Sequence, residues 1–183
     1  MIIPATLDRS TRTGWPLVST LPPLAALPTA PGTARAHVGA VLAYWQMSAL
    51  ADLAELIATE LVTNALRAST TPAGGPCYVN GRVALIWVCL MSDGLRALIE
   101  VHDRAEGAPV LRDAGPYAET GRGLHLIDAL TGGDWGWYSK RPQPGKCVWA
   151  VISLDGETVP QLTALTPAGR REPFTAVPAS FRP

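Results

Sequence analysis

The sequence predicts an α+β fold, a two-layer α/β sandwich in which helices cover one face of a mostly antiparallel sheet. The chain has 183 residues, of which 48% are hydrophobic and 16% charged, and this composition is typical of a globular domain with a substantial core. The predicted elements follow in the order helix, helix, strand, strand, loop, helix, strand, strand. Segregated helices and strands of this kind favour helices packed on one side of an antiparallel sheet.

Prolines separate the two ends of the chain from its centre. The N-terminal segment and the segment from Asp155 onward are both rich in proline, which excludes a continuous helix. We expect residues 1–27 to form a loose arm or an edge strand, residues 28–154 to form the folded domain, and residues 155–183 to form a tail.

Hydrophobic periodicity places the elements within the central domain. Apolar residues recur at helical spacing in residues 32–46 and, more strongly, in residues 51–69, and a short third helix is expected over 124–130. Strand-forming residues dominate four further segments. These strands are expected as two antiparallel pairs, residues 82–91 with 96–103 and residues 135–139 with 146–154, separated by a loop over 104–121.

Charge and hydropathy exclude several classes of function. Fifteen basic residues balance fifteen acidic ones, which argues against a direct nucleic-acid-binding surface. The N-terminal residues show no signal-peptide pattern, and the longest apolar run, residues 83–91, is too short to span a bilayer. We therefore expect a cytoplasmic protein with no membrane segment.

The cysteines and histidines give no metal-binding spacing. Three cysteines lie far apart without a CxxC pair, which favours a reducing compartment over disulfides or a zinc site. The histidines His37, His102 and His125 are widely spaced and predict no metal cluster.

The helix over residues 51–69 carries two polar side chains beside its apolar stripe. Glu60 and Asn64 lie one turn apart, and both border the stripe formed by Leu53, Ile57 and Leu61. A carboxylate and an amide in this position cost free energy unless a partner satisfies them. Two interpretations stay open, namely hydrogen bonds to a neighbouring loop or a general base beside a metal-ligating amide oxygen.

The strand over residues 96–103 ends in a carboxylate on its apolar face. Side chains alternate along a strand, so Ala97, Ile99, Val101 and Asp103 point to the same side. Asp103 therefore either caps the following loop or accepts a hydrogen bond from a ligand, and Gly107 follows close behind it.

Glycines stand directly before the third predicted helix, in the stretch ETGRGLHLIDAL. Gly121 and Gly123 flank Arg122 at a point where free backbone N–H groups and the helix dipole attract anions. A single GxG is common in turns, and the stretch lacks both the third glycine of a dinucleotide-binding loop and the GKS or GKT of a Walker loop. Alone it is a weak indication of an anion site.

Taken in order, these blocks resemble the ATP-binding site of the GHKL superfamily, which includes histidine-kinase ATPase domains, gyrase-type ATPases and bacterial anti-sigma-factor serine kinases. The stretches ELVTNALRAS, VHDRAEGAP, ETGRGLHLIDAL and GKCVWAV look most like the anti-sigma-factor kinases and the stand-alone ATP-binding regulators of actinobacteria. The resemblance covers residues 28–154 and implies the α/β sandwich of that superfamily, the Bergerat ATP-binding fold.

The resemblance implies a role for each matching residue. Asn64 would give its side-chain oxygen to the Mg²⁺ that bridges the ATP phosphates, and Glu60 would orient or deprotonate the attacking hydroxyl or water. Asp103 would bind the adenine amino group, and Gly107 would let the backbone approach the base. Residues 107–120 would form a lid. The backbone N–H groups that would bind the phosphates are those of Gly121, Arg122, Gly123 and Leu124.

Two positions depart from the family pattern. Ala105 replaces the first glycine of the D-x-G-x-G block, which would tighten the adenine pocket. Cys147 replaces a threonine that supports the adenine-binding carboxylate in the family, and a thiol is a weaker donor. The resemblance therefore implies a modest nucleotide affinity.

The implied activity is that of a Mg-ATP-dependent serine/threonine protein kinase of the anti-sigma-factor type. Such a kinase would bind a sigma factor, an anti-anti-sigma protein or both, and would phosphorylate the latter; retention of Glu60 favours this interpretation. The alternative is a non-catalytic ATP-sensing module that regulates a partner by stoichiometric binding, which the changes at Ala105 and Cys147 favour. Because the family often dimerises, a homodimer is a further expectation.

Overall fold

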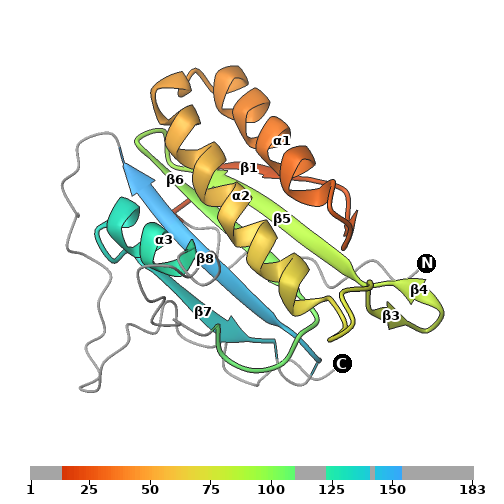
Figure 1. The fold of residues 1–183 in the computed structure, drawn as a ribbon. Coiled ribbons are helices and arrows are strands. Elements are labelled where there is room, and N and C mark those ends of the chain that lie inside the picture. Colours follow the sequence, from red (N-terminus) through yellow and green to blue (C-terminus); the bar gives the residue numbers. More distant parts are fainter. Residues whose placement is uncertain (1–13, 110–122, 141–142, 154–183) are drawn as a thin grey trace, which may run out of the picture.

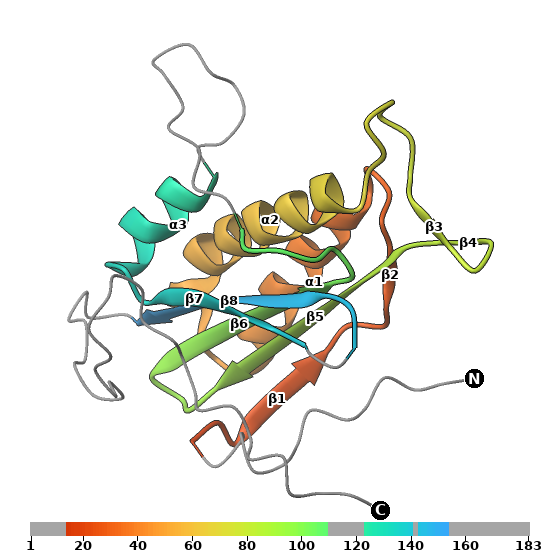
Figure 2. The same ribbon diagram turned by 90° about the horizontal axis from the view of Figure 1, so that it is seen from below.

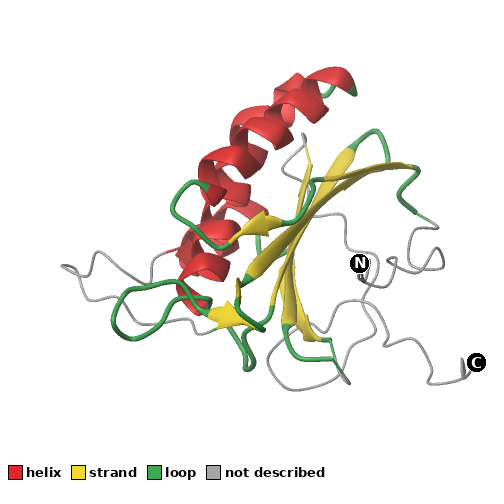
Figure 3. Ribbon diagram, turned by 90° about the vertical axis from the view of Figure 1, so that its right-hand side faces the viewer, coloured by secondary structure: helices red, strands yellow, loops and turns green. Residues whose placement is uncertain are grey.

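Helices and sheet form two layers in the computed structural model, which describes residues 14–109, 123–140 and 143–153 (Figure 1). The helices lie together on one face of the sheet, as the side view in Figure 3 shows. The predicted α+β sandwich with an antiparallel sheet is confirmed.

Every strand pair of the described sheet is antiparallel. Both predicted hairpins are formed, and the second strand of the later hairpin lies against the second strand of the earlier one. The order across the sheet is β1 (Leu17–Thr20), β5 (Leu85–Ser92), β6 (Arg96–Asp103), β8 (Lys146–Ser153) and β7 (Trp135–Ser139), and β2 (Leu24–Ala25) also pairs with β5.

Part of the N-terminal segment belongs to the sheet. Strand β1 pairs with β5, with Leu17 opposite Ser92, and Trp15 just ahead of it is buried. Of the two states expected for residues 1–27, the described part is therefore an edge strand, and the sheet begins ahead of residue 28. Residues 1–13 and the whole of the proposed tail, residues 155–183, lie outside the described residues.

Each long helix presents a continuous apolar stripe to the sheet. In α1 (Ala30–Tyr44) the buried residues recur at every fourth position, and α2 (Ala51–Ala68) follows a short 3₁₀ turn, Ser48–Leu50. Figure 2 shows α2 and α3 (Gly123–Thr131) above the strands. None of the helices in the described ranges is long and apolar enough to cross a membrane. The stripe of α2 consists of Ala54, Ile57, Ala58, Leu61, Val62 and Ala65.

Alternation along the strands divides the core into two parts. On β6, Ile99 and Val101 join the main core under the helices, whereas Leu98 packs with Trp15 and Trp149 on the opposite side. We call this opposite side the far face of the sheet. Glu100 and His102 have the same parity as Leu98 and therefore belong to the far face.

The prediction of one continuous strand over residues 82–91 is wrong, because the structure has two separate strands in this stretch. Residues Arg82–Val83 form β4, which pairs with β3 (Tyr78–Val79) in a separate hairpin, and β5 begins only at Leu85. Asn80 and Gly81 connect β3 and β4 with φ angles of 51° and 73°. This Asn-Gly turn is typical of tight hairpins. The prediction missed it because residues 82–91, which follow the turn, are uniformly rich in strand-forming residues.

Candidate functional site

Glu60 and Asn64 of α2 lie against the first residue of α3. Both side chains are half-buried, and Gly123 is buried. A Cβ atom at Gly123 would stand 2.5 Å from Glu60 Oε2 and 3.4 Å from Asn64 Nδ2, so any side chain there would displace the carboxylate. The structure thus brings together three predicted site residues from two separate stretches of sequence.

The side-chain nitrogen of Asn64 is not hydrogen-bonded to any residue that the structure describes. This Nδ2 atom is also buried. Leaving a buried polar group unpaired costs about 1–3 kcal/mol. A bound ligand would remove this cost, and rotation of the amide would let either its nitrogen or its oxygen face that ligand.

The start of α3 adds donors at the same place. The first N–H groups of a helix have no partner within the helix, and its dipole favours negative charge there. Leu124 is buried in the main core and so anchors this end of α3. Gly121, Arg122 and residues 110–120 of the expected lid lie outside the described residues.

Asp103 has a different set of neighbours. The carboxylate is buried at the end of β6, where Oδ1 accepts hydrogen bonds from Lys146 Nζ at 2.9 Å and from the Ala105 backbone N–H at 2.8 Å. Burial raises the pKa of Asp103, and the Lys146 ammonium and the Ala105 N–H offset part of that rise. The loop-capping interpretation of Asp103 is therefore confirmed, while its ligand-binding role stays a prediction.

Two glycines shape the backbone around Asp103. Gly145 has a φ of +118°, and a Cβ atom there would overlap the carbonyl oxygen of Asp103. Gly107 is exposed and has a φ of +91°, a conformation that other residues rarely adopt. The loop after β6 and the start of β8 can therefore adopt these conformations because both positions are glycine.

Cys147 does not support Asp103, contrary to the expectation from the sequence. In the β6–β8 register Asp103 stands opposite Lys146, and His102 stands opposite Cys147. Since neighbouring residues of a strand point to opposite faces, Lys146 rather than Cys147 reaches the carboxylate. The inference that the thiol weakens the support of Asp103 is wrong.

The far face holds a polar cluster that the sequence analysis missed. Glu100, His102 and Cys147 are all buried, and one potential ligand atom from each lies within 4.8 Å of the others. The histidine spacing had predicted no metal cluster, but these groups are brought together by strand pairing. The available signal was the Glu-x-His spacing on β6, which places both side chains on one face.

Comparisons with known proteins add no assignment. The chain matches no protein-family model, and no curated protein is significantly similar to it.

Proposed function

We propose that the chain is a Mg-ATP-binding regulatory protein of the GHKL type, with the nucleotide phosphates at the junction of α2 and α3. The observation that carries the proposal is the meeting of Glu60, Asn64 and Gly123, where the buried Nδ2 atom of Asn64 has no hydrogen-bond partner among the described residues. These residues come from ELVTNALRAS and ETGRGLHLIDAL, two of the four blocks that resemble that superfamily.

The residues at this junction fit Mg²⁺ and a polyphosphate. Asn64 would offer its amide oxygen to the metal ion, and the N–H groups at the start of α3 would bind phosphate oxygens. When bound, Mg²⁺ neutralises charge that develops on the transferred phosphoryl group. Glu60 would orient the attacking hydroxyl and accept its proton.

Asp103 retains capacity for an adenine amino group. A carboxylate offers about four lone-pair sites, and two hydrogen bonds to described residues occupy part of them. These two bonds hold the carboxylate in one orientation at the end of β6. In the proposed complex the amino group of adenine would donate to this fixed acceptor.

Of the two functions considered, we favour the serine/threonine protein kinase. Glu60 lies directly beside the start of α3, where the phosphates would bind, and that is where phosphoryl transfer needs a base. The sensor alternative drew support from Cys147, and this support is lost because Cys147 faces away from Asp103. We propose a sigma factor, an anti-anti-sigma protein or both as partners, in the cytoplasm, with a homodimer as the assembly.

Nucleotide binding tests the proposal directly. We expect Asn64→Ala to weaken ATP binding about tenfold or more in the presence of Mg²⁺ and to have little effect without it, because the lost amide acts through the metal ion. Asp103→Asn should weaken binding with and without Mg²⁺. The measurement is calorimetric titration of the folded protein with ATP, with folding checked by circular dichroism.

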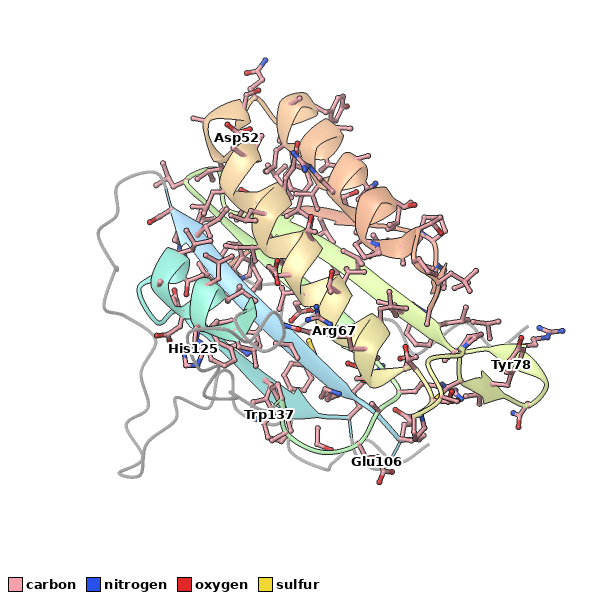
Figure 4. All side chains as sticks on the ribbon, viewed as in Figure 1. Asp52, Arg67, Tyr78, Glu106, His125 and Trp137 are labelled. Carbon is pink, nitrogen blue, oxygen red and sulfur yellow. The ribbon has the colours of Figure 1, made fainter. Side chains whose placement is uncertain are left out.

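Asp52→Asn provides the matched control for this titration. Asp52 is an exposed carboxylate at the N-terminal end of α2, away from Arg67 at the other end (Figure 4). Its replacement should leave ATP affinity unchanged. If the wild-type protein binds no ATP at millimolar concentration, the proposed function is wrong.

The Glu60→Gln variant distinguishes a kinase from a non-catalytic ATP sensor. The amide has the shape of the carboxylate but accepts no proton, so ATP binding should persist while phosphoryl transfer falls by about 10²–10⁴-fold. The measurement is transfer of labelled phosphate from ATP to a candidate anti-anti-sigma protein. Equal transfer by Glu60→Gln and wild type would contradict a catalytic role for Glu60. Binding without transfer in the wild type would support the sensor.

A further inference from the structure

Strand pairing brings together one carboxylate, one imidazole and one thiol on the far face of the sheet. Glu100 and His102 lie two residues apart on β6 and so share a face, and Cys147 stands directly opposite His102 on β8. Potential ligand atoms of the three side chains lie within 4.8 Å of one another. We call these three residues the far-face cluster.

The far-face cluster is buried, and its Glu100 and His102 side chains are poorly satisfied. Glu100 is 8% exposed, His102 is 6% exposed and Cys147 is fully buried. Glu100 Oε2 and both ring nitrogens of His102 have no hydrogen-bond partner among the described residues. Glu100 Oε2 and His102 Nε2 are 3.5 Å apart, too far for a good hydrogen bond.

Three polar atoms of this buried cluster have no hydrogen-bond partner in the part of the chain that the structure describes, and a bound ligand would satisfy them. Each costs about 1–3 kcal/mol of stability when left unsatisfied, and the apolar side chains around them offer no compensating hydrogen bonds. A cation bound at their centre would satisfy Glu100 and one nitrogen of His102 at once. A carboxylate and a thiolate would also balance the charge of a divalent ion.

The chemistry of the donors selects the ion. Oxygen, nitrogen and sulfur donors together are the ligand set of Zn²⁺, whereas Mg²⁺ and Ca²⁺ take oxygen ligands. Ligand atoms around a tetrahedral zinc ion lie roughly 3–4 Å apart, given Zn–ligand distances of about 2.0–2.3 Å. The three ligand atoms, which lie within 4.8 Å of one another, would have to draw closer together to reach that geometry.

We propose that Glu100, His102 and Cys147 bind one Zn²⁺ ion on the far face of the sheet, with a water molecule in the fourth position. The ion would cross-link β6 to β8 beside the Asp103–Lys146 pair. It would lie across the sheet from Glu60 and Asn64, which are on α2. This inference does not depend on the proposed nucleotide site.

Zinc binding by the untagged, full-length protein tests the inference. After removal of metal with a chelator, competition against a chromophoric zinc indicator should show one Zn²⁺ per chain, and zinc should raise the Tm by several degrees. Glu100→Gln and Cys147→Ser should each lower the zinc affinity at least about tenfold and reduce the rise in Tm at the same zinc concentration. Glu100→Gln should leave the stability of the metal-free protein largely unchanged.

Cys77→Ser is the matched control, because Cys77 is a half-buried free cysteine outside the far-face cluster. With Co²⁺ as a spectroscopic probe, the thiolate-to-cobalt charge-transfer band should be present in Cys77→Ser and absent in Cys147→Ser. If Cys147→Ser does not fold, the loss of zinc binding in Glu100→Gln decides instead. Failure of the wild type to bind zinc, or equal binding by wild type and Glu100→Gln, would overturn the proposal.

Discussion

Replacing Lys146 by methionine is expected to lower the free energy of unfolding by about 3–5 kcal/mol at neutral pH. The Lys146 side chain is 8% exposed, and its ammonium lies 2.9 Å from an Asp103 carboxylate that is 1% exposed. Methionine preserves most of the apolar stem but removes the charge. The carboxylate would then remain buried without its counter-ion, and this accounts for the loss.

The loss of stability in Lys146→Met should depend on pH in a defined direction. Burial raises the pKa of Asp103 and Lys146 opposes that rise, so the pKa climbs further when the ammonium is removed. A carboxyl group whose folded pKa lies above its unfolded value takes up a proton on folding, and stability then increases as the pH falls through the folded pKa. The difference in the free energy of unfolding between wild type and Lys146→Met should therefore become smaller as the pH is lowered towards the ordinary carboxyl range.

Urea unfolding at a series of pH values measures this effect. The double variant Asp103→Asn/Lys146→Met should recover much of the loss, because no charge is left buried. Lys140→Met is the matched control: the Lys140 ammonium lies 5.4 Å from the ring centre of Trp87, a contact worth about 1 kcal/mol. A deficit that does not change with pH would show that the charge of Asp103 is not its cause.

Local pattern was sufficient to predict most elements of the fold. Residues 51–69 were expected as a helix and α2 is Ala51–Ala68, since its apolar residues recur in helical register. The bounds expected for β6 and β7 are those observed. The β1–β5 pairing was harder to predict, because strands far apart in sequence carry no local mark of their partner.

The site was predictable only as separate pieces. The position of Glu60 and Asn64 beside the apolar stripe follows from helical geometry alone. The approach of Gly123 to both depends on how α3 packs on α2, and no single stretch encodes this. The partner of Asp103 depends on strand register, where a shift of one residue exchanges Lys146 for Cys147 and reverses the face.

Gly145→Ala is the second variant with a large expected effect, a loss of about 2–5 kcal/mol in the free energy of unfolding. The residue has a φ of +118°, and an added Cβ would overlap the Asp103 carbonyl oxygen and stand 3.1 Å from Arg104 Cα. Both obstacles are backbone atoms, so no change of side-chain rotamer relieves them. The loop after β6 or the start of β8 would have to move.

Comparison with Gly94→Ala separates the effect of the steric overlap at position 145 from the effect of the strained backbone conformation. Gly94 has a φ of +93° in the β5–β6 turn, and a Cβ there would meet no atom within 4 Å. Its replacement should therefore cost only about 1 kcal/mol, from the backbone conformation alone. Chemical denaturation of both variants gives the comparison, and equal losses would show that the approach of Gly145 to Asp103 is unimportant. Because the displaced atom belongs to Asp103, the proposed adenine contact adds a second expectation: Gly145→Ala should weaken ATP binding, and Gly94→Ala should not.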